Sequence, residues 1–369
     1  MNKSISVCHL TPTFFSESSV IGGGERYVYN LVQSVNKANP TNETQVLQSI
    51  ASIANTPGNF EYDGTEVHLL KSIARSQDNM NYIPHGLWEY LKKFDVVHVH
   101  QSLTPFGEYC VAVAASLHIP IVATDLGGGD SNLMLFGKGL ELADRVLAIS
   151  NFANSLTKNS YSGKTEIVIG PVDTDYFTPK YSDKHGKGHA ICVSRILPHK
   201  GIDRIISAIP KELGLKIVGK VYDHKYFALL KKMAKGKNIE FVQNADDKSL
   251  LRLYQQADIF LQGSTHKDIY GNSIQKPELM GLTTLEAMAC GLPVVVSDAG
   301  SLPELVPNNI VGRVFENHSD LVSIFKDYVS GKWPSSAACN QARAHVVDNY
   351  SFMSIGRKLS RIYKEVSEK

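Results

Sequence analysis

A segment of twenty residues, Pro277–Val296, constrains the fold of this chain more than any other. Two glutamates, Glu278 and Glu286, lie eight positions apart in it around a Gly-Leu-Thr-Thr turn, and a later glycine precedes a valine-rich stretch. A short helix that stops at glycine before a buried strand is typical of the crossovers of a parallel α/β sheet. Positions eight apart on a helix lie roughly 80° apart, so both carboxylates can face one ligand.

The turn between the two glutamates predicts an anion site. The first amide groups of a helix have no partner within the helix, and a helix start attracts negative charge. We therefore expect four turn residues to hold a phosphate group: Gly281, Leu282, Thr283 and Thr284. A nucleotide sugar presents ribose hydroxyls, a diphosphate and sugar hydroxyls in that order, which suits a phosphate site between two carboxylates. The alternative is a pair of solvated glutamates on a surface helix.

The composition indicates a soluble enzyme of two domains. At 369 residues the chain exceeds the size at which a single core usually keeps growing. Its hydrophobic content of 43% and charged content of 20% are ordinary, and a net charge of +2 gives no argument for nucleic-acid binding. No apolar run approaches the roughly 20 residues of a membrane helix. The five cysteines are scattered through mostly apolar stretches, which favours reduced thiols in a cytoplasmic protein.

Short apolar strands alternate with helical patterns along the chain, which predicts an α/β fold built from parallel βαβ units. In the first half we expect strands at Ile5–Leu10, Thr44–Ile50, Val96–His100, Ile119–Thr124, Arg145–Ile149 and Glu166–Ile169, and helices at Glu25–Asn36, Pro105–Leu117 and Asn151–Lys158. In the second half we expect strands at Ala190–Ser194, Leu215–Val218, Ile239–Val242, Ile259–Gln262, Pro293–Ser297 and Arg313–Phe315. The charged, aperiodic stretch Thr178–His189 is the expected linker, and Phe352–Glu365 has the spacing of a last helix.

With its flanking residues, the Glu-x7-Glu segment resembles the signature of retaining nucleotide-sugar glycosyltransferases of family 4, which have the GT-B fold. The resemblance covers nearly the whole chain. It implies two Rossmann-like domains facing each other across a cleft: an acceptor domain at 1–180, a donor domain at 181–350, and a helix at 351–369 that crosses back to the first domain. By this resemblance, Glu286 holds the ribose diol. Glu278 contacts the hydroxyls of the donor sugar and supports the positive charge at its anomeric carbon.

A second segment, Ser194–Asp203, resembles the turn from which the family binds the donor diphosphate. Arg195 and Lys200 are the matching cations. Because enzymes of this fold generally lack a bound divalent metal, cations and helix starts must offset the charge of the leaving group. We therefore expect no metal and no cofactor. The alternative for both side chains is an ordinary surface position.

An Asp-x-Asp triplet, Asp173 to Asp175, is the one pattern that favours a metal. In a different glycosyltransferase fold such a triplet binds manganese. Here it lies in a segment that resembles the family's Gly-Val-Asp-x-x-x-Phe-x-Pro stretch before the linker, with Pro171 in place of the usual glycine. We interpret the triplet as structural, close to the domain hinge.

Two histidines end a strand in the first half. Alternation places His98 and His100 on one face, with His100 nearer the carboxyl end of the strand, where α/β sheets bind ligands. Members of the resembled family have a histidine there beside the transferred sugar. We therefore expect His100 to bond a sugar hydroxyl or to position the backbone, and His98 to be a hydrogen-bonded core residue.

Two glycine-containing loops of the first half are candidates for the acceptor side. Gly23, Gly24 and Glu25 follow the first strand at a helix start and match the family's Gly-Gly-x-Glu pattern. Asp125 and Asp130 flank a run of glycines after another strand, at a point where the family often has a histidine or an aromatic residue. A tight turn and solvated turn carboxylates are the respective alternatives.

The resemblance implies transfer of a hexose from a nucleoside diphosphate, with UDP first among the bases, to a hydroxyl of a glycan, a lipid carrier or a small metabolite. A nucleotide-sugar epimerase, a phosphorylase and a non-catalytic partner subunit are the alternatives, since fold does not fix function. The amphipathic stretch His85–Phe94 either packs on the first sheet or touches a membrane at the inner face. The polar stretch Ser264–Lys276 either selects substrates or is a surface insertion.

Overall fold

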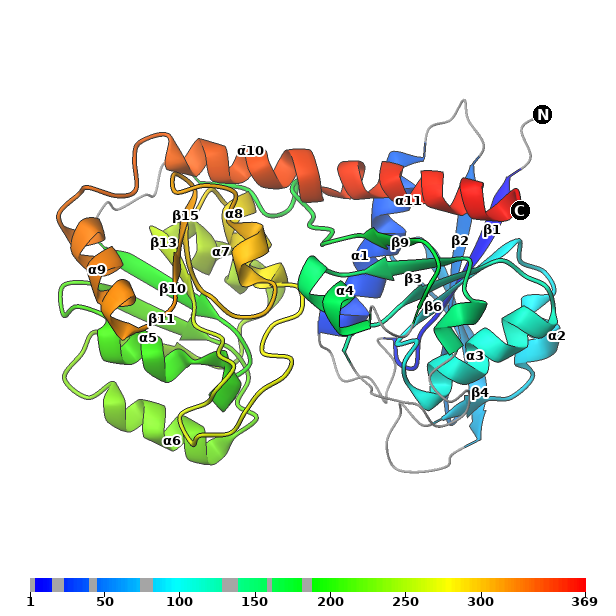
Figure 1. Cartoon of the computed structure of the whole chain (residues 1–369), viewed down its shortest axis with the longest axis horizontal. Helices are drawn as coiled ribbons and strands as arrows, with labels where there is room; N and C mark the ends of the chain where they lie inside the picture. Colours follow the sequence, from blue (N-terminus) through cyan, green and yellow to red (C-terminus); the bar gives the residue numbers. More distant parts are fainter. Residues whose placement is uncertain are drawn as a thin grey trace. The chain divides into compact units, whose positions relative to one another are not determined.

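The computed structural model describes residues 4–14, 23–39, 45–73, 82–127, 139–157, 161–180 and 188–369. The chain forms two compact units (Figure 1). Unit 1 consists of Met1–Pro171 together with Ser351–Lys369, and unit 2 consists of Val172–Tyr350.

The first division between the units lies between Pro171 and Val172, whereas the sequence analysis placed it between residues 180 and 181. The segment after Pro171 bonds to unit 2, because the amide of Val172 donates to the carbonyl of Tyr350 at 2.8 Å. The guanidinium of Arg343 also donates to the carbonyls of Thr174 and Phe177, both at 3.0 Å. Backbone groups of the expected hinge are thus held by the last helix of unit 2.

Unit 1 is built on a twisted, mainly parallel sheet with the order β3-β4-β2-β1-β6-β7-β8-β9, and β5 pairs with β4. Its strands are β1 (Ile5–Leu10), β2 (Val46–Ala54), β3 (Gly58–Tyr62), β4 (Thr65–Ile73), β5 (Ile83–Pro84), β6 (Val96–His100), β7 (Ile121–Thr124), β8 (Arg145–Ala148) and β9 (Thr165–Ile167). Its α-helices in the described ranges are α1 (Gly23–Ala38), α2 (Leu87–Leu91), α3 (Pro105–Ser116), α4 (Asn151–Thr157) and α11 (Phe352–Ser367).

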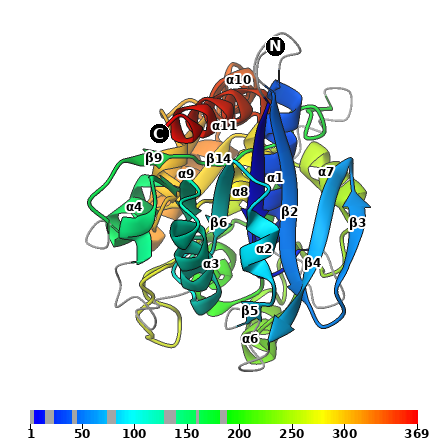
Figure 2. The same cartoon turned by 90° about the vertical axis from the view of Figure 1, so that its right-hand side faces the viewer.

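Helices cover both faces of this sheet (Figure 2). One face packs on α2 and α3 through a core that includes Leu87, Phe106 and Val99. The other face is covered by α1 and α11, which also pack on each other. At that contact a Cβ on Gly356 would lie 1.9 Å from the carbonyl oxygen of Ser34, so the absence of a side chain lets the two helices approach closely.

Unit 2 has a parallel sheet with the order β12-β11-β10-β13-β14-β15. Its strands are β10 (His189–Val193), β11 (Gly214–Val218), β12 (Ile239–Val242), β13 (Ile259–Gln262), β14 (Val294–Ser297) and β15 (Gly312–Phe315). Its α-helices are α5 (Ile202–Ala208), α6 (His224–Met233), α7 (Asp247–Gln256), α8 (Leu282–Ala289), α9 (His318–Val329) and α10 (Ala338–Tyr350). This is the strand order of a dinucleotide-binding fold, so the prediction of Rossmann-like α/β units is confirmed.

The regular elements agree with the sequence except between residues 50 and 95. There β3 and β4 form an antiparallel hairpin, and α2 follows the short β5. The hairpin turns at Asp63 and Gly64, which have φ values of 46° and 73°. An Asp-Gly pair between two strand-like runs is a recognised hairpin signal, and the sequence analysis overlooked it. No helix in the described part of the chain has the length and apolar character needed to cross a membrane.

Candidate functional site

The predicted donor residues of unit 2 follow the carboxyl ends of two adjacent strands. Arg195 and Lys200 come after β10, whereas Gln262 ends β13 and Glu278 lies in the segment that follows it. Strands β10 and β13 are neighbours, and the sheet order reverses between them. Ligands of open α/β sheets bind outside the carboxyl ends of the strands at this reversal. The fold therefore places the predicted residues at a ligand-binding position.

The carboxylate of Glu278 is the centre of a hydrogen-bond network. Its Oε2 accepts from Nζ of Lys200 at 2.9 Å and from Nε2 of Gln262 at 2.7 Å. Its Oε1 accepts from the amide of Gly281 at 3.3 Å. Burial raises the pKa of Glu278, but Lys200 and the amide donors outweigh burial and hold the pKa below its ordinary value. The predicted phosphate cation and the predicted sugar-binding carboxylate thus form one mostly buried ion pair.

Glu278 precedes helix α8, and only Glu286 lies on the helix. Our use of helical spacing for this pair was therefore wrong. The physical reason is Gly281, which takes a left-handed conformation with φ of 77° and starts the helix after Glu278. The carboxylate reaches the helix start by bonding to the Gly281 amide instead.

Fewer backbone amides are available to an anion at this helix start than the sequence suggested. The amide of Gly281 is bonded to Glu278, and the amide of Thr284 donates to the carbonyl of Gly281 at 3.0 Å. The amides of Leu282 and Thr283 remain the candidates for a phosphate contact.

The backbone of Glu278 is in close contact with the turn at Gly300 and Ser301. Its carbonyl accepts from the amide of Ser301 at 3.1 Å. A Cβ on Gly300, whose φ is 61°, would lie 2.0 Å from that same carbonyl oxygen. The turn after β14 therefore fixes the backbone of Glu278. A larger residue at Gly300 would have to displace that backbone.

Glu286 and the preceding residues Thr283 and Thr284 are also bonded to side chains from other segments. Tyr254 is fully buried, and its hydroxyl donates to Oε2 of Glu286 at 3.0 Å. The same hydroxyl lies 3.3 Å from the carbonyl of Thr283. The Thr284 hydroxyl donates to Oε1 of Gln262 at 2.6 Å, and Gln262 bonds to Glu278. Tyr254 thus supports Glu286, and Gln262 connects Glu278 to Thr284. Sequence reasoning missed Tyr254 and Gln262 because they come from other segments of the chain.

Arg195 is exposed, unlike the buried Lys200. Its guanidinium carbon lies 5.8 Å from the ring centre of Tyr222. His199 lies between the two cations in sequence, and burial with the nearby charges of Lys200 and Arg195 lowers its pKa to about 4. The turn after β10 therefore keeps its histidine neutral beside two cations.

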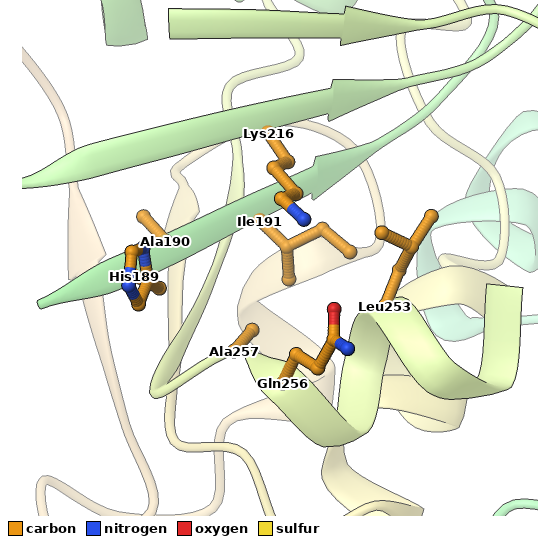
Figure 3. Close-up of a pocket in the computed structure, with 7 residues that line it drawn as sticks. All are labelled: His189, Ala190, Ile191, Lys216, Leu253, Gln256 and Ala257. Atoms are coloured by element: carbon orange, nitrogen blue, oxygen red, sulfur yellow. The ribbon is translucent and has the colours of Figure 1, made fainter. Parts of the chain in front are cut away.

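A cavity of about 230 Å³ lies elsewhere in unit 2 (Figure 3). Its lining residues come from β10, β11 and the end of α7: His189, Ala190, Ile191, Lys216, Leu253, Gln256 and Ala257. His189 is the first residue of β10, whereas Arg195 and Lys200 follow the last. The cavity is therefore at the wrong end of the strand to be the predicted donor site.

Three buried histidines meet at the corresponding strand reversal of unit 1. His9 of β1 pairs in register with His98 of β6, and its Nδ1 lies 3.0 Å from Nε2 of His100. His98 bonds to the hydroxyls of Tyr363 and Thr124, both at 2.8 Å, so the expectation of a hydrogen-bonded core residue is confirmed. Burial is the main cause that lowers the pKa of all three imidazoles, that of His9 to about 4. Sequence reasoning missed His9, although it too lies near the carboxyl end of its strand.

The loop candidates of unit 1 are only partly described. Gly23 and Gly24 begin α1, and Glu25 is a buried residue of its first turn. Asp125 follows β7 and accepts the amide of Gly127 at 2.9 Å. Asp130 lies outside the described residues. For the described members of this group, a role toward the acceptor stays a prediction.

Two further sequence features have defined structures. The segment Ser264–Lys276 forms a short hairpin in which the buried Asp268 accepts the amides of Tyr270 and Asn272, both at 2.9 Å. Asp173 of the Asp-x-Asp triplet accepts the amide of Asp175 at 3.1 Å, as in a structural turn.

Two family models match consecutive parts of the chain. Residues 21–176 match "Glycosyltransferase Family 4", and residues 175–343 match "Glycosyl transferases group 1". Together they cover most of the chain.

Curated relatives are similar at a lower level. The chain is 26% identical over 247 residues to a GDP-mannose-dependent alpha-(1-6)-phosphatidylinositol monomannoside mannosyltransferase of Mycolicibacterium smegmatis; this match covers 60% of the chain and 62% of the relative. It is 26% identical to an uncharacterized glycosyltransferase of Methanocaldococcus jannaschii over 75% of this chain and 76% of the relative. It is 22% identical to the GPI3 subunit of a phosphatidylinositol N-acetylglucosaminyltransferase of Saccharomyces cerevisiae, over 75% of this chain and 64% of the relative.

Solved structures share the fold over almost the full length. A sucrose-phosphate synthase from Thermosynechococcus elongatus superposes with a TM-score of 0.73 at 18% identity and covers 98% of this chain and 99% of its own. HepE of Anabaena, in complex with UDP and glucose, superposes with a TM-score of 0.72 at 15% identity, over 98% of this chain and all of its own. With the family models on both halves and this fold, the chain belongs to the group 1 glycosyltransferases of family 4.

Proposed function

We propose that this chain transfers a hexose from a nucleoside diphosphate donor to an acceptor hydroxyl, with retention at the anomeric carbon. The observation that carries the proposal is the Lys200–Glu278 pair at the strand reversal of unit 2, beside the start of α8. Nζ of Lys200, a cation for phosphate, lies 2.9 Å from Oε2 of Glu278, a carboxylate for sugar hydroxyls. In a nucleotide sugar, the phosphate and the sugar are likewise neighbouring groups.

Stabilisation of the leaving diphosphate is the main chemical task. In our proposal, Lys200 keeps its bonds to Glu278 and to the carbonyl of Pro277 and directs its third N–H at the phosphates. Arg195 approaches from the exposed side, and the amides of Leu282 and Thr283 complete the contact. Preorganised cations and amides aimed at developing negative charge are worth about 10²–10³ in rate per donor. Glu286 would hold the ribose diol, supported by Tyr254. No metal ion is required in this scheme, and turnover in EDTA would test that.

Retention is proposed to follow a front-face route. A carboxylate nucleophile needs a free lone pair on the face opposite the leaving group. Oε2 of Glu278 already accepts from both Lys200 and Gln262, and its lowered pKa makes it a weak nucleophile. In our proposal, an oxygen of the departing phosphate accepts the proton of the acceptor hydroxyl instead.

The donor is proposed to be UDP-linked or GDP-linked. UDP was the first choice from the sequence, and HepE, a structural neighbour, binds UDP and glucose. The mannosyltransferase relative is named as GDP-mannose-dependent. A thermal-shift panel of UDP, GDP and ADP would decide between the bases, because a ligand that binds only the folded state raises its stability.

The acceptor is proposed to be a glycan, a lipid-linked sugar or a small metabolite. A lipid-linked acceptor would require the protein to contact a membrane surface. Two relatives act on phosphatidylinositol compounds according to their names. Helix α2 buries Leu87 and Leu91 in the core of unit 1 and leaves Trp88 44% exposed near Lys92. An aromatic side chain beside lysine suits an anionic lipid surface. Sedimentation with anionic vesicles would test this contact, and loss of binding in Trp88→Ala would support it.

A second candidate is a subunit that needs a partner, since one relative is itself named as a subunit. A nucleotide-sugar epimerase is a third. Incubation with nucleotide sugar alone and then with acceptors separates these functions. A transferase releases nucleoside diphosphate faster with acceptor, an epimerase isomerises the donor without acceptor, and a lone subunit does neither. Binding without release in every acceptor mixture would overturn the proposed function.

A further inference from the structure

The buried histidine cluster of unit 1 contains a chain of hydrogen bonds from Gln48 through His9 to His100. His9 Nε2 lies 3.0 Å from Oε1 of Gln48, and His9 Nδ1 lies 3.0 Å from Nε2 of His100. Both imidazoles are fully buried on one face of the sheet. The resemblance assigns an expected role to His100 alone and gives none to His9 or Gln48.

The orientation of the Gln48 amide is fixed by two other contacts. Its Nε2 donates to the carbonyl of Val32 at 2.9 Å and lies 2.8 Å from Oδ1 of Asn36. A backbone carbonyl can only accept, so the nitrogen of the amide must face Val32. Oε1 of Gln48 therefore faces His9, and Nε2 of His9 must donate to it.

The position of each proton then follows along the chain. His9 is neutral because burial lowers its pKa to about 4. A neutral imidazole carries one proton, so Nδ1 of His9 is an acceptor and Nε2 of His100 donates to it. Nδ1 of His100 is left with a lone pair, and among the described residues this buried atom has no hydrogen-bond partner. A buried polar atom without a partner is destabilising, so this lone pair favours a group that donates to it.

We infer that Gln48 and His9 are positioning residues that hold His100 in the Nε2–H tautomer, so that its Nδ1 accepts a hydrogen bond from a hydroxyl of a bound sugar. This inference rests on the proposed function for the identity of the ligand. An acceptor atom selects groups that carry a proton, such as hydroxyls, and rejects carbonyl and phosphate oxygens. His100 would thus bind a sugar hydroxyl and not a phosphate oxygen.

A metal site is the competing use of the cluster, since one ligand atom from each histidine lies within 4.8 Å of the others. The hydrogen bonds argue against it. Both nitrogens of His98 are bonded to hydroxyls, and a proton already lies between His9 and His100. A metal would have to replace these contacts.

Nitrogen NMR of the full chain, labelled with 15N in its histidine rings, tests the tautomers without ligand. Protonated and bare ring nitrogens have well-separated shifts, and single substitutions assign His9 and His100. We expect Nε2–H on both rings at pH 7. A proton on Nδ1 of His100, or shifts that change on addition of Zn²⁺ at one equivalent, would overturn the inference. Because this measurement needs no turnover, its outcome is independent of the proposed function.

Ligand contact is tested with UDP-glucose or GDP-mannose, whichever raises the melting temperature of the protein. Saturation should move the Nδ1 shift of His100 toward that of a hydrogen-bonded nitrogen. An unmoved shift would mean that water or nothing fills this position, and would overturn the contact. If neither donor raises the melting temperature, the proposed function fails and the tautomer result stands on its own.

Three variants separate positioning from packing. Gln48→Met removes the acceptor for His9, so we expect mixed tautomers at His9 and His100 and about a tenfold lower kcat/KM. Gln48→Glu keeps the acceptor for His9 but puts a carboxylate oxygen against the carbonyl of Val32, so we expect the single tautomer together with a lower melting temperature. Gln33→Met is the matched control, because this glutamine of α1 also bonds to the backbone, at Asp63, but lies outside the chain of histidines. Equal effects of Gln48→Met and Gln33→Met would contradict a positioning role.

Discussion

At the scale of single residues, Glu278 joins the parts of the candidate donor site. It accepts from Lys200, Gln262 and the start of α8, and its own carbonyl is held by the turn at Ser301. A carboxylate so fully bonded is preorganised, which is what stabilisation of a growing charge requires. The sequence pointed to Glu278, Lys200 and Gly281 as site residues but not to their bonds with one another or with Gln262 and Ser301, because these contacts join separate segments of the chain.

Replacement of Glu278 by glutamine should lower turnover by about 100-fold or more, while nucleoside diphosphate binding changes little. The amide removes the negative charge beside the sugar and frees Lys200 for the phosphates. Kinetics and calorimetric titration measure the two effects. Glu240→Gln is the control, because this exposed glutamate lies 3.9 Å from Lys216 and takes no part in the site. Unchanged turnover in Glu278→Gln would remove Glu278 from the mechanism.

The buried histidines should make the protein sensitive to mild acid. The pKa of His9 is about 4 in the folded chain and 6.5 ordinarily, so the unfolded chain binds more protons between these values. Stability is therefore complete above about pH 6.5 and lost as the pH falls toward 4, by about 3 kcal/mol from this residue alone. Denaturant unfolding at several pH values measures the loss. His224→Gln, at an exposed position, should leave the curve unchanged, and a flat curve for the wild type would contradict a buried neutral cluster.

At the scale of elements, the start of α8 depends on glycines that let backbones meet. Gly281 begins the helix in a left-handed conformation, and Gly300 brings the turn after β14 against Glu278. A sequence predicts such glycines only as turn residues, since the neighbour that excludes a side chain comes from elsewhere in the chain. The same limit explains why our helical spacing for the two glutamates failed.

Gly300→Ala should destabilise the protein and lower turnover together. Its Cβ would meet the Glu278 carbonyl at 2.0 Å, and the shift needed to relieve that clash costs about 1–3 kcal/mol. Gly236→Ala is the matched control, because it has a similar positive φ of 76° but no atom within 4 Å of the added Cβ. Thermal unfolding and turnover of both variants measure the difference. Equal losses would show that backbone conformation alone, and not the contact with Glu278, matters.

Most elements were predictable because apolar periodicity and turn residues are local signals. Strand β6, α3 and the whole of the second sheet lie within a few residues of their predicted bounds. The β3–β4 hairpin was missed although Asp63-Gly64 marks its turn, since its strands have mixed polarity and are partly exposed. The histidine chain was only half predictable: His98 and His100 share a strand, but His9 and Gln48 join them through pairing of distant strands.

At the scale of the whole molecule, the chain leaves unit 1, completes unit 2 and returns with α11. The return depends on the contact of α11 with α1 at Gly356. Gly356→Ala would put a Cβ 1.9 Å from the carbonyl oxygen of Ser34, so we expect a loss of about 1–3 kcal/mol in unfolding free energy. Arg357→Ala, at the next and exposed position, is the control for urea unfolding. A Gly356→Ala variant as stable as the wild type would contradict this close packing.

In our proposal, unit 2 binds the diphosphate of a nucleotide sugar at the strand reversal, with Lys200 as the buried cation. Calorimetric titration of UDP and GDP into the wild type, Lys200→Met and Lys216→Met tests it most directly, with melting temperatures to verify folding. Lys216 is the matched control because it lines the separate cavity of unit 2. We expect that one of the two nucleotides binds the wild type and Lys216→Met equally well and binds Lys200→Met at least tenfold more weakly. Full binding by Lys200→Met, or loss of binding in Lys216→Met alone, would contradict it.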